Sequence, residues 1–231
     1  MSLKIFGVEG LPEVKAGDDL AGLIAEAAEL ADGDVVVVTQ KIVSKAEDAM
    51  VMVDPDDPLS HKPVVEQESV RVLRRRGDLV ISETKHGFVC ANAGVDRSNV
   101  AADAAALLPD DPDRSARRIR DGIRARAGVE VGVIVSDTFG RPWRRGVTDV
   151  AIGVAGVRPI LDLRGTPDTS GRELLVTEVA IVDELAAAAE LVMGKTEGIP
   201  VAVIRGVDPG WLGPGSIQRD VIRPPAEDLF R

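Results

Sequence analysis

Residues 137–145, directly after an apolar stretch of the chain, contain an acid, a hydroxyl and three arginines. Asp137 and Thr138 are adjacent, and this pair of oxygen ligands suits Mg²⁺ or Mn²⁺. Arg141, Arg144 and Arg145 follow in a predicted tight loop, and arginines suit phosphates or carboxylates. The pattern predicts a site for an anionic small ligand. The alternative is a structural loop whose arginines pair only with surface acids.

A second polar stretch, residues 39–47, follows a run of four valines. It places Lys41 and Lys45 among amide and hydroxyl groups, at a strand end where open α/β sheets commonly bind ligands. The alternative is a loop with solvated lysines, because lysine is mostly exposed in proteins.

A third stretch begins at His86, consists mainly of small residues, and ends with Asp96 and Asn99. Small residues let a ligand approach the backbone closely, and an aspartate there would suit a hard metal ion. The alternative is a turn in which Asp96 or Ser98 caps a helix that begins near Asn99. Cys90 is expected to be a small core residue. His86 is either a solvent-facing strand residue or a substrate contact.

These stretches together predict a nucleotide site that uses divalent metal ions. The metals would neutralise phosphates and stabilise charge during phosphoryl transfer. The residues alone leave both the nucleotide and the acceptor open.

Several common motifs are absent from the sequence. Gly194-Lys195-Thr196 looks like the end of a P-loop, but Ala189 stands where the motif needs its first glycine. The tripeptide also ends a predicted helix, whereas a P-loop precedes one, so we interpret Gly194 as a helix cap. No GxGxxG follows a predicted strand, and one cysteine and two histidines are too few for a Cys/His metal cluster.

Secondary-structure elements must position these residues. Their predicted order from the N-terminus begins with a strand, a helix and a second strand, which is typical of a mixed α/β fold. Apolar runs predict strands at 3–8, 35–38, 79–82, 87–91, 129–135 and 200–204. Helical spacing and caps predict helices at 19–31, 65–76, 113–127 and 174–192. Gly, Pro and Asp clusters predict loops at 54–63 and 164–172, and an irregular tail at 208–231.

Composition narrows the class of protein. The chain has 231 residues, a net charge of −10, 45% apolar residues and only 3% aromatic ones. We therefore expect one large domain or two small ones, with an aliphatic core. An acidic chain lacks the basic face that nucleic-acid binding needs. One cysteine excludes an intrachain disulfide. With no signal-peptide pattern or membrane-length apolar run, we expect a cytoplasmic protein with no nucleic-acid or membrane partner.

Four blocks, in this order, resemble the coenzyme F(420)-0:γ-glutamyl ligase family. They are residues 40–47, 86–99, 136–146 and 176–180. The resemblance extends from Gly10-Leu11-Pro12 to residues 200–206 and covers nearly the whole chain. Some members carry a fused flavin-reductase-like domain. This chain resembles the stand-alone ligase, with a single domain over residues 1–231.

The resemblance implies an unusual α+β fold with two intertwined sub-domains, neither P-loop nor ATP-grasp. It also implies a homodimer with the active site near the subunit interface. The implied activity is GTP-dependent addition of L-glutamate to the deazaflavin coenzyme precursor F(420)-0. GTP would convert the terminal carboxylate to an acyl phosphate and leave as GDP. The glutamate amine would then form the amide and release phosphate, and later additions would use the γ-carboxylate of the previous glutamate.

The resemblance also assigns residues. Asp96 and Asp137 match metal-binding aspartates, with Thr138 on the second of two divalent ions, Mg²⁺ or Mn²⁺; K⁺ is a further candidate ion. The implied nucleotide contacts are Leu11, Pro12, Glu13, Val14, Gln40, Lys45 and Asn99. From its charge, we add Arg141 to the two aspartates as a catalytic candidate that would bind phosphate or glutamate.

Two positions depart from the family pattern. Gln40 stands where other members have a serine, so its nucleotide contact is expected through the backbone. Asp48 follows Glu47 where those members have glycine, a change that would alter a turn.

Two other functions fit the same residues. A metal-dependent nucleotide phosphohydrolase would also use Asp96, Asp137 and Thr138. A non-catalytic nucleotide-binding module would bind GDP tightly without turnover. The order of the four blocks favours the ligase.

Overall fold

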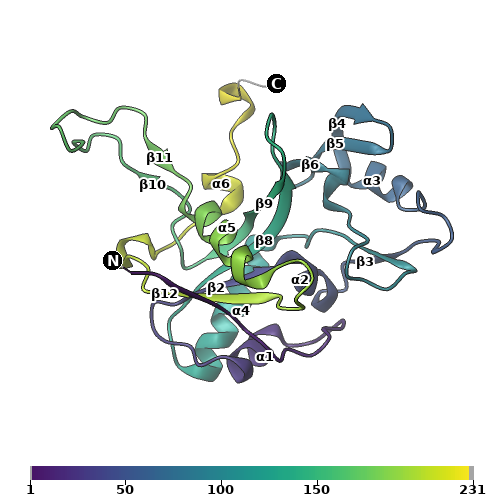
Figure 1. The fold of residues 1–231 in the computed structure, drawn as a ribbon, viewed down its shortest axis with the longest axis horizontal. Coiled ribbons are helices and arrows are strands. Elements are labelled where there is room, and N and C mark those ends of the chain that lie inside the picture. The colour runs from purple at the N-terminus through teal and green to yellow at the C-terminus, as the bar shows by residue number, and fades with distance from the viewer. Residues whose placement is uncertain (1, 229–231) are drawn as a thin grey trace.

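A mixed five-stranded sheet forms the centre of the protein in a computed structural model that describes residues 2–228 (Figure 1). Its strands, in spatial order, are β1 (Lys4–Gly7), β12 (Val201–Arg205), β2 (Val35–Thr39), β8 (Gly132–Gly140) and β9 (Val147–Ala155). Within this sheet β2 and β8 run parallel and the other neighbours run antiparallel. The architecture confirms a mixture of helices and sheets consistent with α+β, while the intertwined sub-domains stay a prediction.

Helices cover both faces of this sheet. The helices α1 (Leu20–Ala27) and α4 (Pro112–Ala127) pack against each other on one face, and α5 (Ile181–Met193) packs on the other (Figure 1). The four valines of β2 are therefore 0% exposed, as expected for a strand with covered faces. The side chain of Asp111 accepts from the backbone N–H of Arg114 at 2.9 Å and caps the start of α4.

The core is aliphatic, as the composition predicts. Its fully buried side chains are almost all Val, Ile, Ala and Leu, with Phe88 and Met193 among the few others. Burial of each large aliphatic side chain stabilises the fold by about 1.5–3 kcal/mol. A smaller second cluster is built on Val53, Val65 and Val80, beneath the smaller sheets.

Three smaller sheets flank the centre. β4 (Ser69–Arg76), β5 (Leu79–Thr84) and β6 (Val89–Ala91) form an antiparallel sheet, and β3 (Met50–Met52) pairs with β7 (Ala104–Ala106). The short strands β10 (Leu161–Asp162) and β11 (Glu178–Val179) start an arm that projects from the body (Figure 1).

The structure corrects four of the predicted elements. The predicted helix 65–76 is wrong: the short helix α3 (Lys62–Glu68) ends where β4 begins. The stretch 39–47 is not a loop but the helix α2 (Gln40–Ala46). The helix α5 begins at Ile181 instead of residue 174, and α1 ends at Ala27 instead of residue 31.

Two features of the central sheet went unpredicted. Strand β8 continues through the acid and hydroxyl pair to Gly140 instead of ending at residue 135. Strand β9, which returns antiparallel to it, was missed altogether. Both errors concern the hairpin that carries Asp137.

The described part of the predicted tail contains only short helical turns. They are η2 (Pro209–Trp211), α6 (Ile217–Asp220) and η3 (Pro225–Glu227). Residues 229–231 of that tail lie outside the described residues. Among residues 2–228, no helix combines the length and the hydrophobicity that crossing a membrane would take.

Candidate functional site

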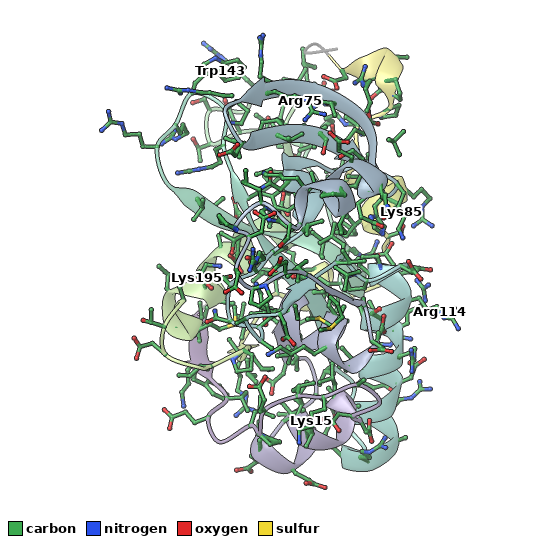
Figure 2. All side chains as sticks on the ribbon, turned by 90° about the vertical axis from the view of Figure 1, so that its right-hand side faces the viewer. Lys15, Arg75, Lys85, Arg114, Trp143 and Lys195 are labelled. Carbon is green, nitrogen blue, oxygen red and sulfur yellow. The ribbon has the colours of Figure 1, made fainter. Side chains whose placement is uncertain are left out.

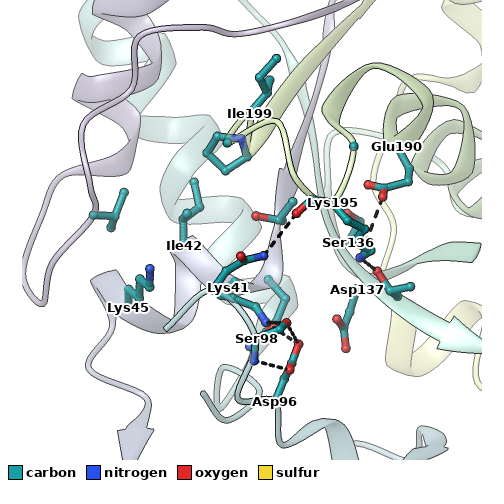
Figure 3. Close-up of a pocket in the computed structure, with 18 of the residues that line it drawn as sticks. Lys41, Ile42, Lys45, Asp96, Ser98, Ser136, Asp137, Glu190, Lys195 and Ile199 are labelled. Carbon is teal, nitrogen blue, oxygen red and sulfur yellow. Dashed lines mark hydrogen bonds and ion pairs between the residues drawn. The ribbon is translucent and has the colours of Figure 1, made fainter. Parts of the chain in front are cut away.

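A cavity of about 420 Å³ opens where the parallel strands β2 and β8 end (Figure 3). Ligands bind at this edge in many α/β sheets. Its walls come from five segments far apart in the chain: the loop after β1, the start of α2, the turn before β7, the β8–β9 hairpin and the loop between α5 and β12. This volume suits a nucleotide-sized ligand.

Asp96 lies on one wall, in an extended turn. Its backbone pairs with Ala106, and its carboxylate accepts from the Ser98 amide and hydroxyl, each at 2.7 Å. The ammonium of Lys41 also donates to it (Figure 3). Burial opposes ionisation, but these donors outweigh it and hold the pKa of Asp96 below its ordinary value. No helix begins near Asn99, so the predicted cap there is wrong.

Asp137 comes from β8 and faces the same space (Figure 3). Burial raises the pKa of its carboxyl to about 7, and the charges of Asp96 and Asp149 add to that effect. The backbone N–H of Thr138 and the charge of Lys41 act in the opposite direction. The cavity therefore concentrates negative charge that a cation would stabilise.

Asp149 is a site residue that sequence reasoning missed. It lies on β9 opposite Thr138, is 2% exposed, and accepts from the hydroxyls of Thr138 at 2.6 Å and Ser136 at 3.0 Å. Residues 147–155, after the arginine loop, are rich in β-branched residues, and an apolar run follows Asp149 directly. This composition was an available strand signal.

Lys195 and Glu190 complete the wall next to Asp149. Lys195 donates to the Thr138 hydroxyl, and its ammonium lies 3.8 Å from Asp149 and 3.9 Å from Glu190. Burial raises the pKa of Glu190, Asp149 raises it further, and Lys195 opposes the shift. Gly194 ends α5, as predicted. The loop that follows places Lys195, the lysine of the rejected P-loop motif, in the wall of the cavity.

The predicted nucleotide contacts also line the cavity. They are Leu11, Pro12, Glu13, Val14, Gln40, Lys45 and Asn99. Lys45 pairs with Glu13 at 2.5 Å. The side-chain amide of Gln40 is buried and donates to the Ser44 hydroxyl at 2.6 Å and the Leu107 carbonyl at 2.7 Å. Since that amide is already engaged, a backbone contact from Gln40 remains the expectation.

Three other candidates lie outside the cavity. Arg141 is exposed at the tip of the β8–β9 hairpin, where it donates to the Arg145 carbonyl at 3.2 Å, so its catalytic role stays a prediction. Cys90 is buried as expected, and burial raises its pKa to about 12. His86 is also buried, and its Nε2 lies 2.9 Å from the Pro109 carbonyl.

The donor chemistry fits a hard divalent cation. Asp96, Asp137 and Thr138 present carboxylate and hydroxyl oxygens to one cavity, and such oxygens are the preferred ligands of Mg²⁺ and Mn²⁺. Among residues 2–228, no three His, Cys, Asp or Glu side chains converge closely enough to form a ligand set on their own. Bound phosphates and water would supply the remaining oxygens, as is usual for Mg²⁺.

Comparison with known proteins decides the family. The family described as F(420)-0:gamma-glutamyl ligase matches residues 10–206. The chain belongs to this family. It is 43% identical to the coenzyme F(420):L-glutamate ligase of Methanothermobacter thermautotrophicus over all of both chains. It is 46% identical to the protein of that name from Methanopyrus kandleri, over 95% of this chain and 94% of that one.

The resemblance of the four sequence blocks to the γ-glutamyl ligase family is thereby confirmed. A third relative, from Haloarcula marismortui and also named coenzyme F(420):L-glutamate ligase, is 42% identical over 99% of this chain and 96% of its own. The match contains every residue that lines the cavity.

One departure from the γ-glutamyl ligase pattern has a visible consequence. Asp48, at the position where the sequence resemblance implies glycine, adopts a φ of +58° just after α2. That left-handed conformation favours glycine, and aspartate is among the few other residues that tolerate it. Aspartate therefore adopts here the left-handed conformation that glycine favours.

Proposed function

We propose that this protein adds L-glutamate to coenzyme F(420)-0 and uses GTP to activate the acceptor. Membership of the γ-glutamyl ligase family and the names of its relatives support glutamate as one substrate. One observation carries the rest of the proposal. The residues expected to hold a nucleotide and those expected to hold metal ions line a single cavity.

The reaction would proceed in two balanced steps. First, a carboxylate oxygen of the acceptor attacks the γ-phosphorus of GTP, so that a C–O–P bond forms and GDP leaves. Then the amine nitrogen of glutamate attacks the acyl carbon, phosphate leaves with the C–O bond electrons, and the amine loses its protons to a base or to water. Neither step needs a protein nucleophile, so catalysis would come from positioning and electrostatics.

This chain's own residues would bind and orient the reactants. Asp96, Asp137 and Thr138 would hold two divalent ions, Mg²⁺ or Mn²⁺, which when bound neutralise phosphate charge. Lys45 and Lys195 would contact phosphate oxygens on opposite sides of the cavity. Asp149 would keep the Thr138 hydroxyl oriented through the 2.6 Å hydrogen bond between them. K⁺ is a further candidate ion.

A homodimer with its active site near the subunit interface is part of the same proposal. The arm that begins with β10 and β11 exposes Leu175 and Val176, which are 72% and 85% exposed. Large exposed apolar side chains of this kind are typical of surfaces that a partner covers. Sedimentation of the purified protein tests the assembly.

The deciding experiment combines purified protein, GTP, Mg²⁺ or Mn²⁺, L-glutamate and unglutamylated coenzyme. Mass spectrometry is expected to show the coenzyme heavier by one or more glutamyl residues, with GDP and phosphate formed in step. GTP hydrolysis that ignores both glutamate and coenzyme would identify a phosphohydrolase instead. Tight GDP binding without any turnover would identify a nucleotide-binding module.

A further inference from the structure

One end of the molecule is strongly basic although the chain is acidic. The tip of the β8–β9 hairpin carries Arg141, Arg144 and Arg145, and the neighbouring strand β4 carries Arg74 and Arg76. All five side chains belong to exposed residues. We call these five residues the arginine surface. Figure 2 shows Trp143 of the tip and Arg75 of β4 at the same end of the molecule, and Figure 1 places the two hairpins side by side.

Within the part of the chain that the structure describes, no acid neutralises the arginine surface. Within residues 2–228, none of its five arginines forms an ion pair with a carboxylate, whereas their neighbours Arg71 and Arg75 pair with Glu83 and Glu66. No acid occurs between Thr138 and Asp149. Among the described residues, the alternative for the arginine loop, in which surface acids pair with it, is therefore not observed. The positive charge is left available to a ligand.

The hairpin that carries part of the arginine surface also lines the cavity. Thr138 lines the cavity, and Arg141 follows three residues later along the same hairpin, about 10 Å away at the usual rise of a strand. Contact between Phe88 and Phe139, with ring centroids 6.1 Å apart, packs the β4–β6 sheet against that hairpin. A substrate whose reactive end lies in the cavity would extend toward these arginines.

The chemistry of glutamate addition creates a ligand of matching charge. Each addition consumes one acceptor carboxylate and brings in two, so the acceptor gains one negative charge per round. An acceptor that returns for a further round therefore carries free carboxylates just behind its reactive end. Arginine is the side chain best suited to carboxylates.

We propose that the arginine surface binds the carboxylates of glutamates already added and favours later additions over the first. This inference rests on the proposed ligase function and extends it to the choice of acceptor. The five arginines are positioning residues, since they would bind the acceptor's tail away from the reacting atoms. RNA and acidic lipids are disfavoured as occupants, because the net charge of −10 opposes the approach of a large polyanion.

The test compares two acceptors, the unglutamylated coenzyme and the coenzyme carrying two γ-linked glutamates. The variants are Arg144→Gln/Arg145→Gln on the hairpin tip and Arg74→Gln/Arg76→Gln on β4. The charge-matched control is Arg114→Gln/Arg117→Gln, on exposed positions of α4. Arg114 lies far from both hairpins in Figure 2. Glutamine keeps the length and polarity of the side chain, so folding should be retained.

We expect each surface variant to lower the ratio of kcat/KM for the diglutamylated acceptor to that for the unglutamylated one by about fivefold. The loss should appear in KM and should shrink as salt is raised, because exposed charges are screened. The control should leave the ratio unchanged. An unchanged ratio in the surface variants, or an equal change in the control, would overturn the inference.

Direct binding separates this inference from the proposed function. Titration calorimetry with the diglutamylated coenzyme should show weaker binding by both surface variants than by wild type and control. If wild type adds no glutamate to either acceptor, the proposed ligase function fails. The binding comparison still shows whether the arginine surface binds the glutamyl carboxylates of the coenzyme. Binding of a short RNA that the variants lose, with binding of the coenzyme unchanged, would assign the arginines to another partner and overturn the inference.

Discussion

Asp137 occupies the least favourable electrostatic position among the cavity carboxylates. Asp96 gains Lys41 and the Ser98 donors, and Asp149 gains two hydroxyls. Asp137 instead has a pKa raised to about 7 by burial and by its two acidic neighbours. A protein normally retains such a carboxylate only where a cation or a reaction uses it.

The Asp137→Asn variant tests that use. Asparagine keeps the shape of the side chain but cannot supply the charge, so we expect glutamate addition to fall by at least about 100-fold. Binding of Mn²⁺, followed by electron paramagnetic resonance, should weaken in the same variant. Its thermal unfolding midpoint should be no lower than that of wild type, because a buried charge has been removed.

A charge-matched control separates the role of Asp137 from the loss of one negative charge. Asp56→Asn changes an exposed loop residue that does not line the cavity and should leave activity and Mn²⁺ binding at wild-type values. Wild-type turnover in Asp137→Asn would remove this residue from the site.

Sequence reasoning identifies the cavity residues that stand in recognisable blocks and misses those that only folding brings near. Asp96, Asp137 and Thr138 were named in advance and line one cavity. Asp149 was not, because its place depends on the register between β8 and β9. Lys195 was dismissed with the P-loop motif, since the sequence does not show where the loop after α5 returns.

At the scale of elements, the buried strands were the easiest to predict and amphipathic segments the hardest. The valine run of β2 is short and entirely β-branched, which favours a buried strand. Residues 69–76 contain both Val and Arg at spacings compatible with a helix, but they form the strand β4 that pairs with β5. Pairing with β5 in the folded protein favours the strand over the helix.

The packing of β9 against α4 depends on Gly153. A Cβ at this position would lie 2.3 Å from the carbonyl carbon and oxygen of Pro112, the first residue of α4. Backbone atoms cannot move aside without shifting the helix. We expect Gly153→Ala to lower the free energy of unfolding by about 2–3 kcal/mol, measured by urea denaturation.

Gly140→Ala is the matched control on the same hairpin. A Cβ on Gly140 meets nothing within 4 Å, so its urea midpoint should stay close to wild type. Equal midpoints for the two variants would show that α4 adjusts freely and that the close approach to Gly153 is not a constraint on the fold.

At the scale of the whole molecule, His86 links the three-stranded sheet region to the start of α4. Its Nε2 lies 2.9 Å and 3.2 Å from the carbonyls of Pro109 and Asp110, so this nitrogen must donate. Its Nδ1 is buried and has no hydrogen-bond partner among the described residues. Its ring stacks on Phe88, which in turn contacts Phe139 of β8. Protonation would place a charge inside this junction.

Global stability should therefore depend on the protonation of His86. Burial lowers its pKa below the ordinary value of 6.5, and Lys85 adds to that shift, while the two carbonyls and Glu68 oppose it. As the pH falls below 6.5, the unfolded chain takes up this proton before the folded protein does. The unfolded state then binds more protons, so stability conferred by neutral His86 is present above pH 6.5 and is lost on acidification.

The His86→Gln variant isolates this contribution, because the glutamine amide can donate to Pro109 but cannot titrate. The raised pKa values of Asp137, Asp183 and Glu190 push stability in the opposite direction with pH, and His61, whose pKa is also lowered, pushes in the same one. These residues are common to both proteins, so their contributions cancel in the difference between the free energies of unfolding of wild type and variant. Between pH 7 and pH 5, urea denaturation should show wild type losing stability relative to the variant, by at most about 1.4 kcal/mol per pH unit for one proton. Parallel curves would mean that His86 accepts its proton equally well in the folded protein, and that the junction tolerates the charge.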